Sequence, residues 1–164
     1  MTAKYEITDQ SHPINPKLHR IRALRDIPAR AWSGEIGGWV ESPENLDQEG
    51  DAWVYGDARV YGDARVYGDA QAFGDAQVAH RDHLLTATVM ASDLWSATLV
   101  RTRDGHHLAV GCWSGTVAEF RAMAESDRWV QADAATITLR RPELLAFADM
   151  CAARVATWTT TKEN

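Results

Sequence analysis

Hydrophobic and polar positions recur with a period of six residues between residues 50 and 79. The hexads of this stretch, GDAWVYGDARVYGDARVYGDAQAFGDAQVA, place small apolar residues two positions apart, as at Ala58 and Val60. Because side chains two apart in a strand share one face, each hexad predicts a short strand with these residues inside and the residue between them outside. Each Gly-Asp pair predicts a corner, since glycine accepts positive φ and aspartate bonds nearby backbone amides.

Short fixed repeats are typical of stacked folds, and hexapeptide periods belong to β-helices. The hexads resemble those of the hexapeptide-repeat family, whose fold is a left-handed parallel β-helix with three hexads in each triangular coil. Val60 and Ala64 follow that family's usual pattern, whereas Tyr55, Tyr61 and Tyr67 stand where glycine or an acid is commoner. The fold class implied by this resemblance is mainly β: a short left-handed parallel β-helix of about two to three coils, flanked by an N-terminal hairpin and a C-terminal α+β module.

The repeats are expected to begin before the first clear hexad. Val40 falls eighteen residues before Ala58, in register with its inward column, so we expect a start near Gly38. Trp39 and Trp53 are expected to cover the open end, because exposed β-edges need protection.

Residues 4–8 and 18–24 alternate in hydropathy and predict two N-terminal strands, with a basic face from Arg20 and its neighbours that we interpret as solvated. The Gly- and Pro-rich stretch after them predicts a loop that leads into the repeats. We therefore divide the chain into N-terminal strands with a leader loop (1–37), the repeats (38–81) and a C-terminal α/β module (82–164).

Two alternating runs in the C-terminal module, 95–102 and 106–112, flank an Asp-Gly turn and predict a hairpin. Trp113-Ser114-Gly115 is expected to break the second strand. Thr116 stands three residues before Glu119, a capping box that predicts a helix over 117–125.

A second C-terminal helix is predicted over 142–156, because Pro142 favours the first turn of a helix. Residues 129–139 fit a strand through TITL and a helix through QADAA. The tail TTTKEN, after the second helix, is expected to fray.

The composition is that of an ordinary globular protein, with 45% hydrophobic and 24% charged residues among 164. No apolar run is long enough to span a membrane, and MTAKYEITDQ lacks the apolar segment of a signal peptide. We therefore expect a cytoplasmic protein without a membrane partner. Cys112 and Cys151 are far apart and predict reduced thiols, the alternative being a disulfide.

The net charge of −6 is concentrated in the repeats. Residues 41–79 hold nine acids against two bases, a charge of −7, and the remainder of the chain sums to +1. This excludes the basic footprint that direct nucleic-acid binding by the repeats requires, and it suits a partner with a basic surface. The alternative is that the corner aspartates only bond turn amides.

Two segments together resemble one family of small proteins encoded by bacteriophages and prophages. They are KYEIT…LHRIRALRDI…GEIGGWVESPENLDQEGDAWVYGDA and, within residues 83–120, HLL…TLVRTRDGHHLAVGCWSGTVAEF. Members carry this leader, a variable number of hexads and a C-terminal module of unknown function, and are often labelled hexapeptide transferases. The sequence departs from the family at residues 89–93, where a Gly-Ser-Arg-like turn is expected.

The first functional hypothesis is protein binding. The resemblance implies an accessory phage protein, non-enzymatic and anti-CRISPR-like, that acts on a host protein or nucleoprotein complex. A homo-oligomer is also expected, because the faces and ends of the repeats are otherwise exposed. Outward aromatic and acidic residues of the repeats suit an interface. The expected surface is Asp51, Trp53, Tyr55, Asp57, Arg59, Tyr61, Asp63, Arg65, Tyr67, Asp69 and Asp75.

The second hypothesis is binding of a nucleotide or another phosphorylated ligand by the C-terminal module. A helix N-terminus offers free amides and a favourable dipole to an anion. The expected residues are Arg101, Arg103, His106, Ser114, Gly115 and Thr116. The alternative is an ordinary capped helix with surface arginines.

The third hypothesis is acyl transfer, as in other hexapeptide β-helices. His80 and His83 are the candidates for a general base near the repeats, although capping or surface roles are the commoner use of such residues. His80-x-x-His83 and His106-His107 lack the further ligands of a tetrahedral metal site. We therefore expect no catalytic residue, metal or cofactor.

Overall fold

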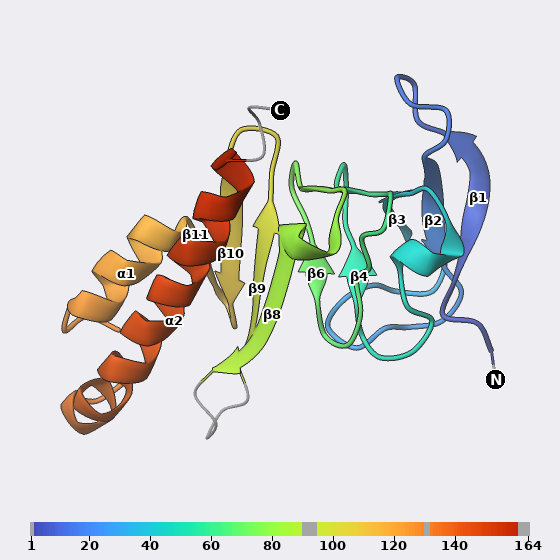
Figure 1. The fold of residues 1–164 in the computed structure, drawn as a ribbon. Coiled ribbons are helices and arrows are strands. Elements are labelled where there is room, and N and C mark those ends of the chain that lie inside the picture. Colours follow the sequence, from blue (N-terminus) through green and yellow to red (C-terminus); the bar gives the residue numbers. More distant parts are fainter. Residues whose placement is uncertain (1, 90–94, 130–131, 161–164) are drawn as a thin grey trace.

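The computed structural model describes residues 2–89, 95–129 and 132–160. Within these residues the chain is mainly β, with several open sheets and two α-helices. In Figure 1 the N-terminal strands lie at one end, the repeats in the middle, and a second large sheet covered by the two helices at the other end. The family's turn at residues 89–93 lies largely outside the described residues.

The strands and helices follow one another along the chain with short connections. They are β1 (Tyr5–Ser11), β2 (His19–Ala23), β3 (Ile36–Val40), β4 (Trp53–Val54), β5 (Arg59–Val60), β6 (Gln71–Ala72), β7 (Gln77–Val78), β8 (Leu84–Val89), β9 (Trp95–Arg101), β10 (His106–Val110), β11 (Trp113–Gly115), α1 (Val117–Glu125) and α2 (Ala134–Thr160). The main sheets have the orders β1-β2-β3-β5-β7 and β11-β10-β9-β8, and β4 pairs with β6.

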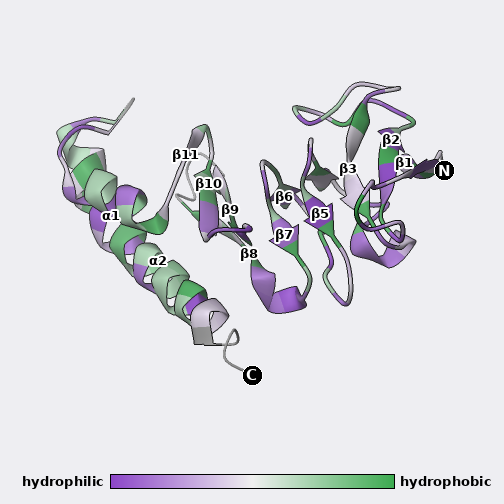
Figure 2. Cartoon of the chain, turned by 90° about the horizontal axis from the view of Figure 1, so that it is seen from above, coloured by the Kyte–Doolittle hydropathy of each residue, from purple (hydrophilic) through white to green (hydrophobic). Residues whose placement is uncertain are grey.

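The repeats pair in parallel with segments one coil further along the chain. Arg59 of β5 lies beside Gln77 of β7, and Trp53 of β4 beside Gln71 of β6, each eighteen residues later. The alternation predicted from the hexads is confirmed, because hydrophilic and hydrophobic positions alternate along β5 and β7 (Figure 2). The inward alanines and valines are buried: Ala58, Val60, Ala64, Val66, Ala70, Ala72, Ala76 and Val78.

The predicted corners are also confirmed. The glycines of five successive hexads have φ between +49° and +65°, a conformation that costs other residues free energy. At Gly62 two features disfavour a side chain: the positive φ, and a Cβ position only 2.5 Å from the carbonyl oxygen of Ala79. The turns at Gly56, Gly62, Gly68 and Gly74 are each closed by a backbone hydrogen bond, as from Ala58 N to Tyr55 O at 3.0 Å.

The first coil is longer than the sequence predicts. Val40 pairs with Val60, twenty residues later, so its expected register with Ala58 is wrong by two residues. The extra two residues lie between Leu46, which bridges to Val66 twenty residues later, and Trp53, which pairs with Gln71 eighteen residues later. A short 3₁₀ helix, Pro43–Asn45, precedes them. The buried side chain of Asn45 holds it against the next coil, donating from Nδ2 to Ala64 O at 2.9 Å and to Gly62 O at 3.2 Å.

Both ends of the repeats are covered by the chain itself. At one end β1 and β2 extend the sheet beyond β3 in antiparallel fashion, as the N-terminal pattern predicts. At the other end Val100 of β9 and Leu84 of β8 pack into the same core as the repeats, and Thr102 bridges to Ala76. Exposed ends were one of the two reasons to expect self-association. Because the chain covers both ends, that reason does not hold.

The C-terminal module follows several of its predictions. The hairpin β9–β10 and the helix α1 form as predicted, with the capping box of Thr116 and Glu119 in place. The second strand ends at Val110, in a turn of Gly111 and Cys112, so the break predicted at Trp113–Gly115 is misplaced: these residues form β11, which pairs with β10. Both cysteines are free, as predicted, and burial raises the pKa of the Cys151 thiol to about 12.

The second helix begins earlier than predicted. α2 starts at Ala134 and passes through Pro142 instead of opening there. Its true start is capped by Asp133, whose Oδ1 accepts from Thr136 N at 2.7 Å. The missing proline amide costs one helical hydrogen bond, and the helix is held by burial of Leu144, Phe147 and other residues against the sheet and α1.

Lys4 closes the N-terminal end of the repeats. Its side chain is fully buried, and Nζ donates to Ala52 O at 3.0 Å and to Glu49 O at 3.2 Å. Burial lowers the pKa of this amine to about 8. Between pH 8 and 10.5 the unfolded chain therefore holds the proton more tightly than the folded one, and stability rises with pH.

We expect the free energy of unfolding to rise by about 2 kcal/mol from pH 8 to pH 10 in the wild-type protein, and this rise to be absent in Lys4→Met. Urea unfolding at fixed salt measures it. Tyr5, whose pKa burial raises to about 12, contributes equally to both proteins. Lys17→Met, at an exposed position, is the matched control and keeps the rise; equal pH profiles for Lys4→Met and wild type would contradict this assignment.

Candidate functional site

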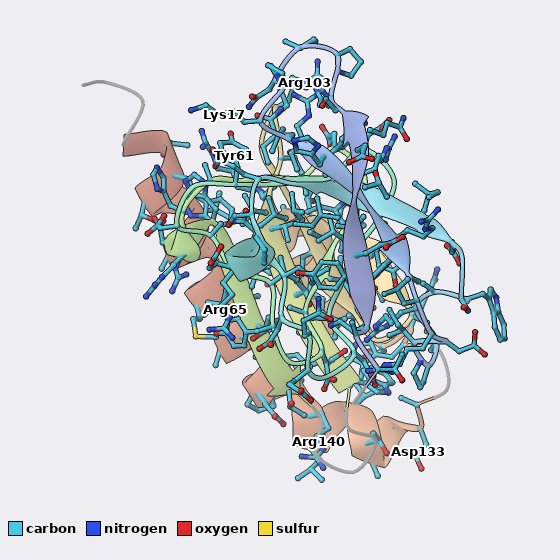
Figure 3. All side chains as sticks on the ribbon, turned by 90° about the vertical axis from the view of Figure 1, so that its right-hand side faces the viewer. Lys17, Tyr61, Arg65, Arg103, Asp133 and Arg140 are labelled. Carbon is cyan, nitrogen blue, oxygen red and sulfur yellow. The ribbon has the colours of Figure 1, made fainter. Side chains whose placement is uncertain are left out.

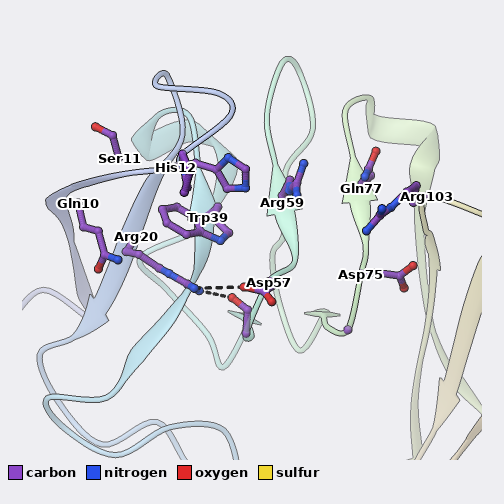
Figure 4. A pocket seen from close by; sticks show the side chains of 13 residues that line it. Gln10, Ser11, His12, Arg20, Trp39, Asp57, Arg59, Asp75, Gln77 and Arg103 are labelled. Carbon is purple, nitrogen blue, oxygen red and sulfur yellow. Dashed lines mark hydrogen bonds and ion pairs between the residues drawn. The ribbon is translucent and has the colours of Figure 1, made fainter.

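A groove of ≈ 690 Å³ lies along the side of the repeats formed by β3, β5 and β7 (Figure 4). Its walls come from three parts of the chain that are distant in sequence: the tip of the β1–β2 hairpin, the outward residues and corners of the repeats, and the turn between β9 and β10. The groove is therefore a product of the tertiary fold. Its volume is in the range typical of small-molecule sites.

The leader wall of the groove is built on Trp39. The guanidinium carbon of Arg20 lies 4.0 Å from the centroid of the indole ring, and the ring of His12 meets the same indole edge-on at 4.8 Å. Arg20 also donates to Gly37 O at 3.0 Å and pairs with Asp57 at 3.2 Å. Arg20 is thus fixed, which corrects its interpretation as a merely solvated base.

His12 faces this wall as a neutral ring. Its Nδ1 accepts hydrogen bonds from the amides of Ile14 at 3.1 Å and Asn15 at 3.2 Å, so the proton of the neutral imidazole resides on Nε2. Burial lowers the pKa of His12 below its usual value, and the positive charges of Arg59 and Arg20 lower it further. The electrostatic environment at His12 is therefore positive within an acidic protein.

The repeat wall presents three side chains from adjacent rows. Arg59 is in register with Gln77, and the antiparallel bridge between Ala76 and Thr102 places Arg103 across from Asp75 on the next row. Figure 4 shows Gln77 between the two arginines, with the side chain of Arg103 directed back toward the repeats. Among the described residues neither the Arg59 nor the Arg103 guanidinium forms a hydrogen bond or an ion pair. These donors are available to a ligand.

The aspartates of the expected protein-binding surface do not share one face. Successive hexads form different sides, so Asp57, Asp63 and Asp69 lie at three different corners. Asp57 and Asp75 border the groove, whereas Asp51 and Asp69 stack at another corner through the bond from Asp51 N to Gly68 O.

Several negative charges of the repeats are paired within the chain. Besides Asp57, which pairs with Arg20, Asp47 binds Arg65 at 2.8 Å and Asp63 binds His80 at 3.0 Å. The excess negative charge is thus divided among corners and partly balanced.

The aromatic members of the expected surface differ in accessibility. Tyr67 is 51% exposed, and Tyr55 and Tyr61 are half-buried. Trp53 is fully buried, which corrects its place on an accessible surface. It does point away from the repeat interior, but the leader sheet covers it, with its indole ring lying over Gly37 close to Ile21.

The predicted anion site of the C-terminal module is not gathered at one point. Arg103 lies in the groove, and Arg101 Nη1 is 3.5 Å from His83 Nε2. His106 Nε2 accepts from the amide of Val117 at 3.0 Å. Ser114 and Gly115 belong to β11.

The N-terminus of α1 already holds a carboxylate of the chain. Glu119 Oε2 accepts from Thr116 N at 2.7 Å, and Thr116 Oγ1 accepts from Glu119 N at 3.2 Å. These hydrogen bonds to backbone and side chain of Thr116 lower the pKa of Glu119. The dipole of α1 therefore acts on Glu119, and binding of an external anion there stays a prediction.

The two candidate base histidines lie in different environments. His83 is buried, and its Nδ1 accepts from Ala79 N at 3.2 Å, which is a capping role; burial and then the charge of Arg101 lower its pKa. His80 is exposed and paired with Asp63, outside the groove of Figure 4. No group of three or more His, Cys, Asp or Glu in the described part of the chain is arranged to hold a metal ion.

The chain matches no protein-family model, no curated protein and no solved structure. No helix within the described ranges is long and apolar enough to cross a membrane.

Sequence reasoning did not assign His12, Arg20 or Gln77 to a site. The signal for Gln77 was present, because the eighteen-residue period places it beside Arg59. The approach of the leader hairpin and of the β9–β10 turn had no comparable signal in the sequence.

We expect Arg59→Gln to raise the pKa of His12 toward its usual value, because the substitution removes a positive charge that disfavours the imidazolium. A titration of the His12 ring protons by NMR measures it. Arg65→Gln alters the same position of an identical hexad on another side and leaves this pKa unchanged. A His12 pKa that does not respond to Arg59→Gln would contradict the proximity of the two groups.

Proposed function

We propose that this protein is a non-enzymatic, phage-type binding protein that acts in the host cytoplasm on a host protein with a basic surface. The observation that carries the proposal is an indole held out on a fixed loop: Trp32 is 75% exposed. Tryptophan is the residue most enriched among those that dominate binding energy at protein interfaces. Its position in the leader supplies an anchor that the repeats alone lack.

The loop that carries Trp32 is held by its own hydrogen bonds. Ile27 N donates to Ala31 O at 2.8 Å, and both residues are buried. Asp26 Oδ1 accepts from Ser33 N at 2.8 Å, and the amide of Trp32 donates to Glu35 at 3.0 Å. A fixed aromatic side chain loses little conformational freedom when a partner binds.

Backbone strain in the same loop supports a role beyond connection. Ala29 has φ of +56°, a non-glycine residue in the left-handed region. Such a conformation costs of order 1 kcal/mol and is kept where the surrounding structure imposes it, frequently at binding sites.

The loop lies next to one acidic corner of the repeats. Arg30 Nη2 is 3.5 Å from the carbonyl oxygen of Asp69. The carboxylates of Asp51 and Asp69 and the half-exposed ring of Tyr67 belong to this corner. A partner that offers an apolar pocket for the indole and lysine or arginine for the carboxylates is complementary to this loop and corner.

The scaffold is proposed to be a left-handed parallel β-helix. Parallel pairing at eighteen residues, glycine corners and small inward residues support it, and so does the resemblance of the hexads to that family. The resemblance to phage proteins supports an anti-defence role, in which an acidic corner competes for a basic groove of a host complex. Acyl transfer has weaker support, since His80 lies outside the groove.

The test is capture of a host partner by tagged protein from bacterial lysate, followed by affinity measurement on the purified pair. We expect Trp32→Ala and Asp69→Lys each to weaken binding about tenfold or more, because they remove an anchor and reverse a charge at one corner. Asp63→Lys is the matched control, at the same hexad position on another corner.

Circular dichroism confirms that each variant is folded. A partner that binds Trp32→Ala as tightly as wild type, or that is lost only with Asp63→Lys, would overturn this assignment of the surface.

A further inference from the structure

We infer that the groove between the leader hairpin, the repeats and the β9–β10 turn binds a small molecule that carries a diphosphate group, held by Arg59, Gln77 and Arg103. This site is separate from the proposed protein-binding corner at Asp51 and Asp69, and it does not depend on that proposal. It also differs from the anion site expected at the N-terminus of α1.

Arg59 and Arg103 lie on the two rows that flank the row of Gln77. Neighbouring rows of a sheet are about 4.8 Å apart, so these outer rows are roughly two spacings apart. Arg103 stands across from Asp75, and Figure 4 shows its side chain directed back toward Gln77. A diphosphate has two anionic centres that two guanidinium groups can bind at once, each through paired N–H donors. The amide of Gln77 adds a donor between them, in the position shown by Figure 4.

The charged side chains of the groove leave an excess of arginine. Asp57 is paired with Arg20 at 3.2 Å, so it does not offset the two unpaired guanidinium groups. Asp75 is the remaining carboxylate of the groove, which leaves the walls with an excess of positive charge. The groove therefore carries a local positive excess although the repeats as a whole are acidic.

The groove also has room and polar groups for the remainder of the ligand. The groove, at ≈ 690 Å³, is larger than a diphosphate requires. Exposed Asp75 beside the arginines accepts hydrogen bonds from hydroxyl or amino groups. The chemistry therefore fits a phosphorylated compound with further polar groups, such as a nucleoside diphosphate, better than a bare anion.

The chain offers a matched control for the site. Arg59 and Arg65 occupy the same position of two identical GDARVY hexads. Arg59 faces the groove, whereas Arg65 pairs with Asp47 on another side. Figure 3 shows Arg65 well apart from Arg103, which is labelled at the top of the view. Replacement of either hexad arginine thus has a similar local effect on the repeat and a different effect on the groove.

The experiment is isothermal titration calorimetry of the full chain with ADP, inorganic pyrophosphate and inorganic sulfate as probes, at low and at physiological salt. We expect ADP and pyrophosphate to bind and sulfate to bind much more weakly. Arg59→Gln and Arg103→Gln are each expected to weaken binding of both phosphate probes about tenfold or more, while Arg65→Gln leaves it unchanged. Asp75→Asn is expected to weaken ADP binding and spare pyrophosphate.

Failure of both phosphate probes to bind the wild-type protein at millimolar concentration would overturn the inference. Equal loss in Arg65→Gln and Arg59→Gln, or sulfate binding as strong as that of pyrophosphate, would also overturn it, because either result means general charge attraction. Arg103 lies in an exposed turn, so Arg103→Gln keeps the test valid if Arg59→Gln does not fold. Trp32→Ala retains probe binding, which separates this inference from the protein-binding proposal.

Discussion

Backbone pairing between successive coils is the interaction on which the rest of the structure depends. The repeat strands are only two residues long, too short to be stable as isolated strands. They persist because each side pairs with the side eighteen residues later and because alanine and valine fill the interior. The corner glycines permit the sharp turns that keep this register.

Such a stack needs protected ends, and the flanking segments supply them. Lys4 donates to carbonyl groups at the first coil, and β8 and β9 cover the last coil while their sheet packs against α1 and α2. The leader and the repeats share one hydrophobic core, and the helices with the outer side of the C-terminal sheet form a second. The cover at each end also makes surface features that the repeats do not have alone.

The two candidate binding regions arise at these covers and use different chemistry. At one corner, Arg30 of the loop that exposes Trp32 reaches the carbonyl oxygen of Asp69. In the groove, Arg20 pairs with Asp57, which leaves two arginines without a partner among the described residues and the single carboxylate of Asp75. The net charge of the repeats therefore does not predict the local charge of either region. Side chains of the flanking segments pair with some of the aspartates and add arginines at the groove.

The sequence by itself determined the repeat, its inward and outward positions, both hairpins and the helix that begins after Thr116, because local spacing encodes all of them. Tertiary structure alone decided the two-residue shift at Val40, the burial of Trp53 and the continuation of α2 through Pro142. Each of these depends on a partner distant in sequence: the hydrogen bonds of Gln48 and Glu49 with Lys4, the leader sheet, and the core beneath the helix. The groove belongs to the same class, because Arg20, Arg59 and Arg103 meet only after the two flanking segments pack against the repeats.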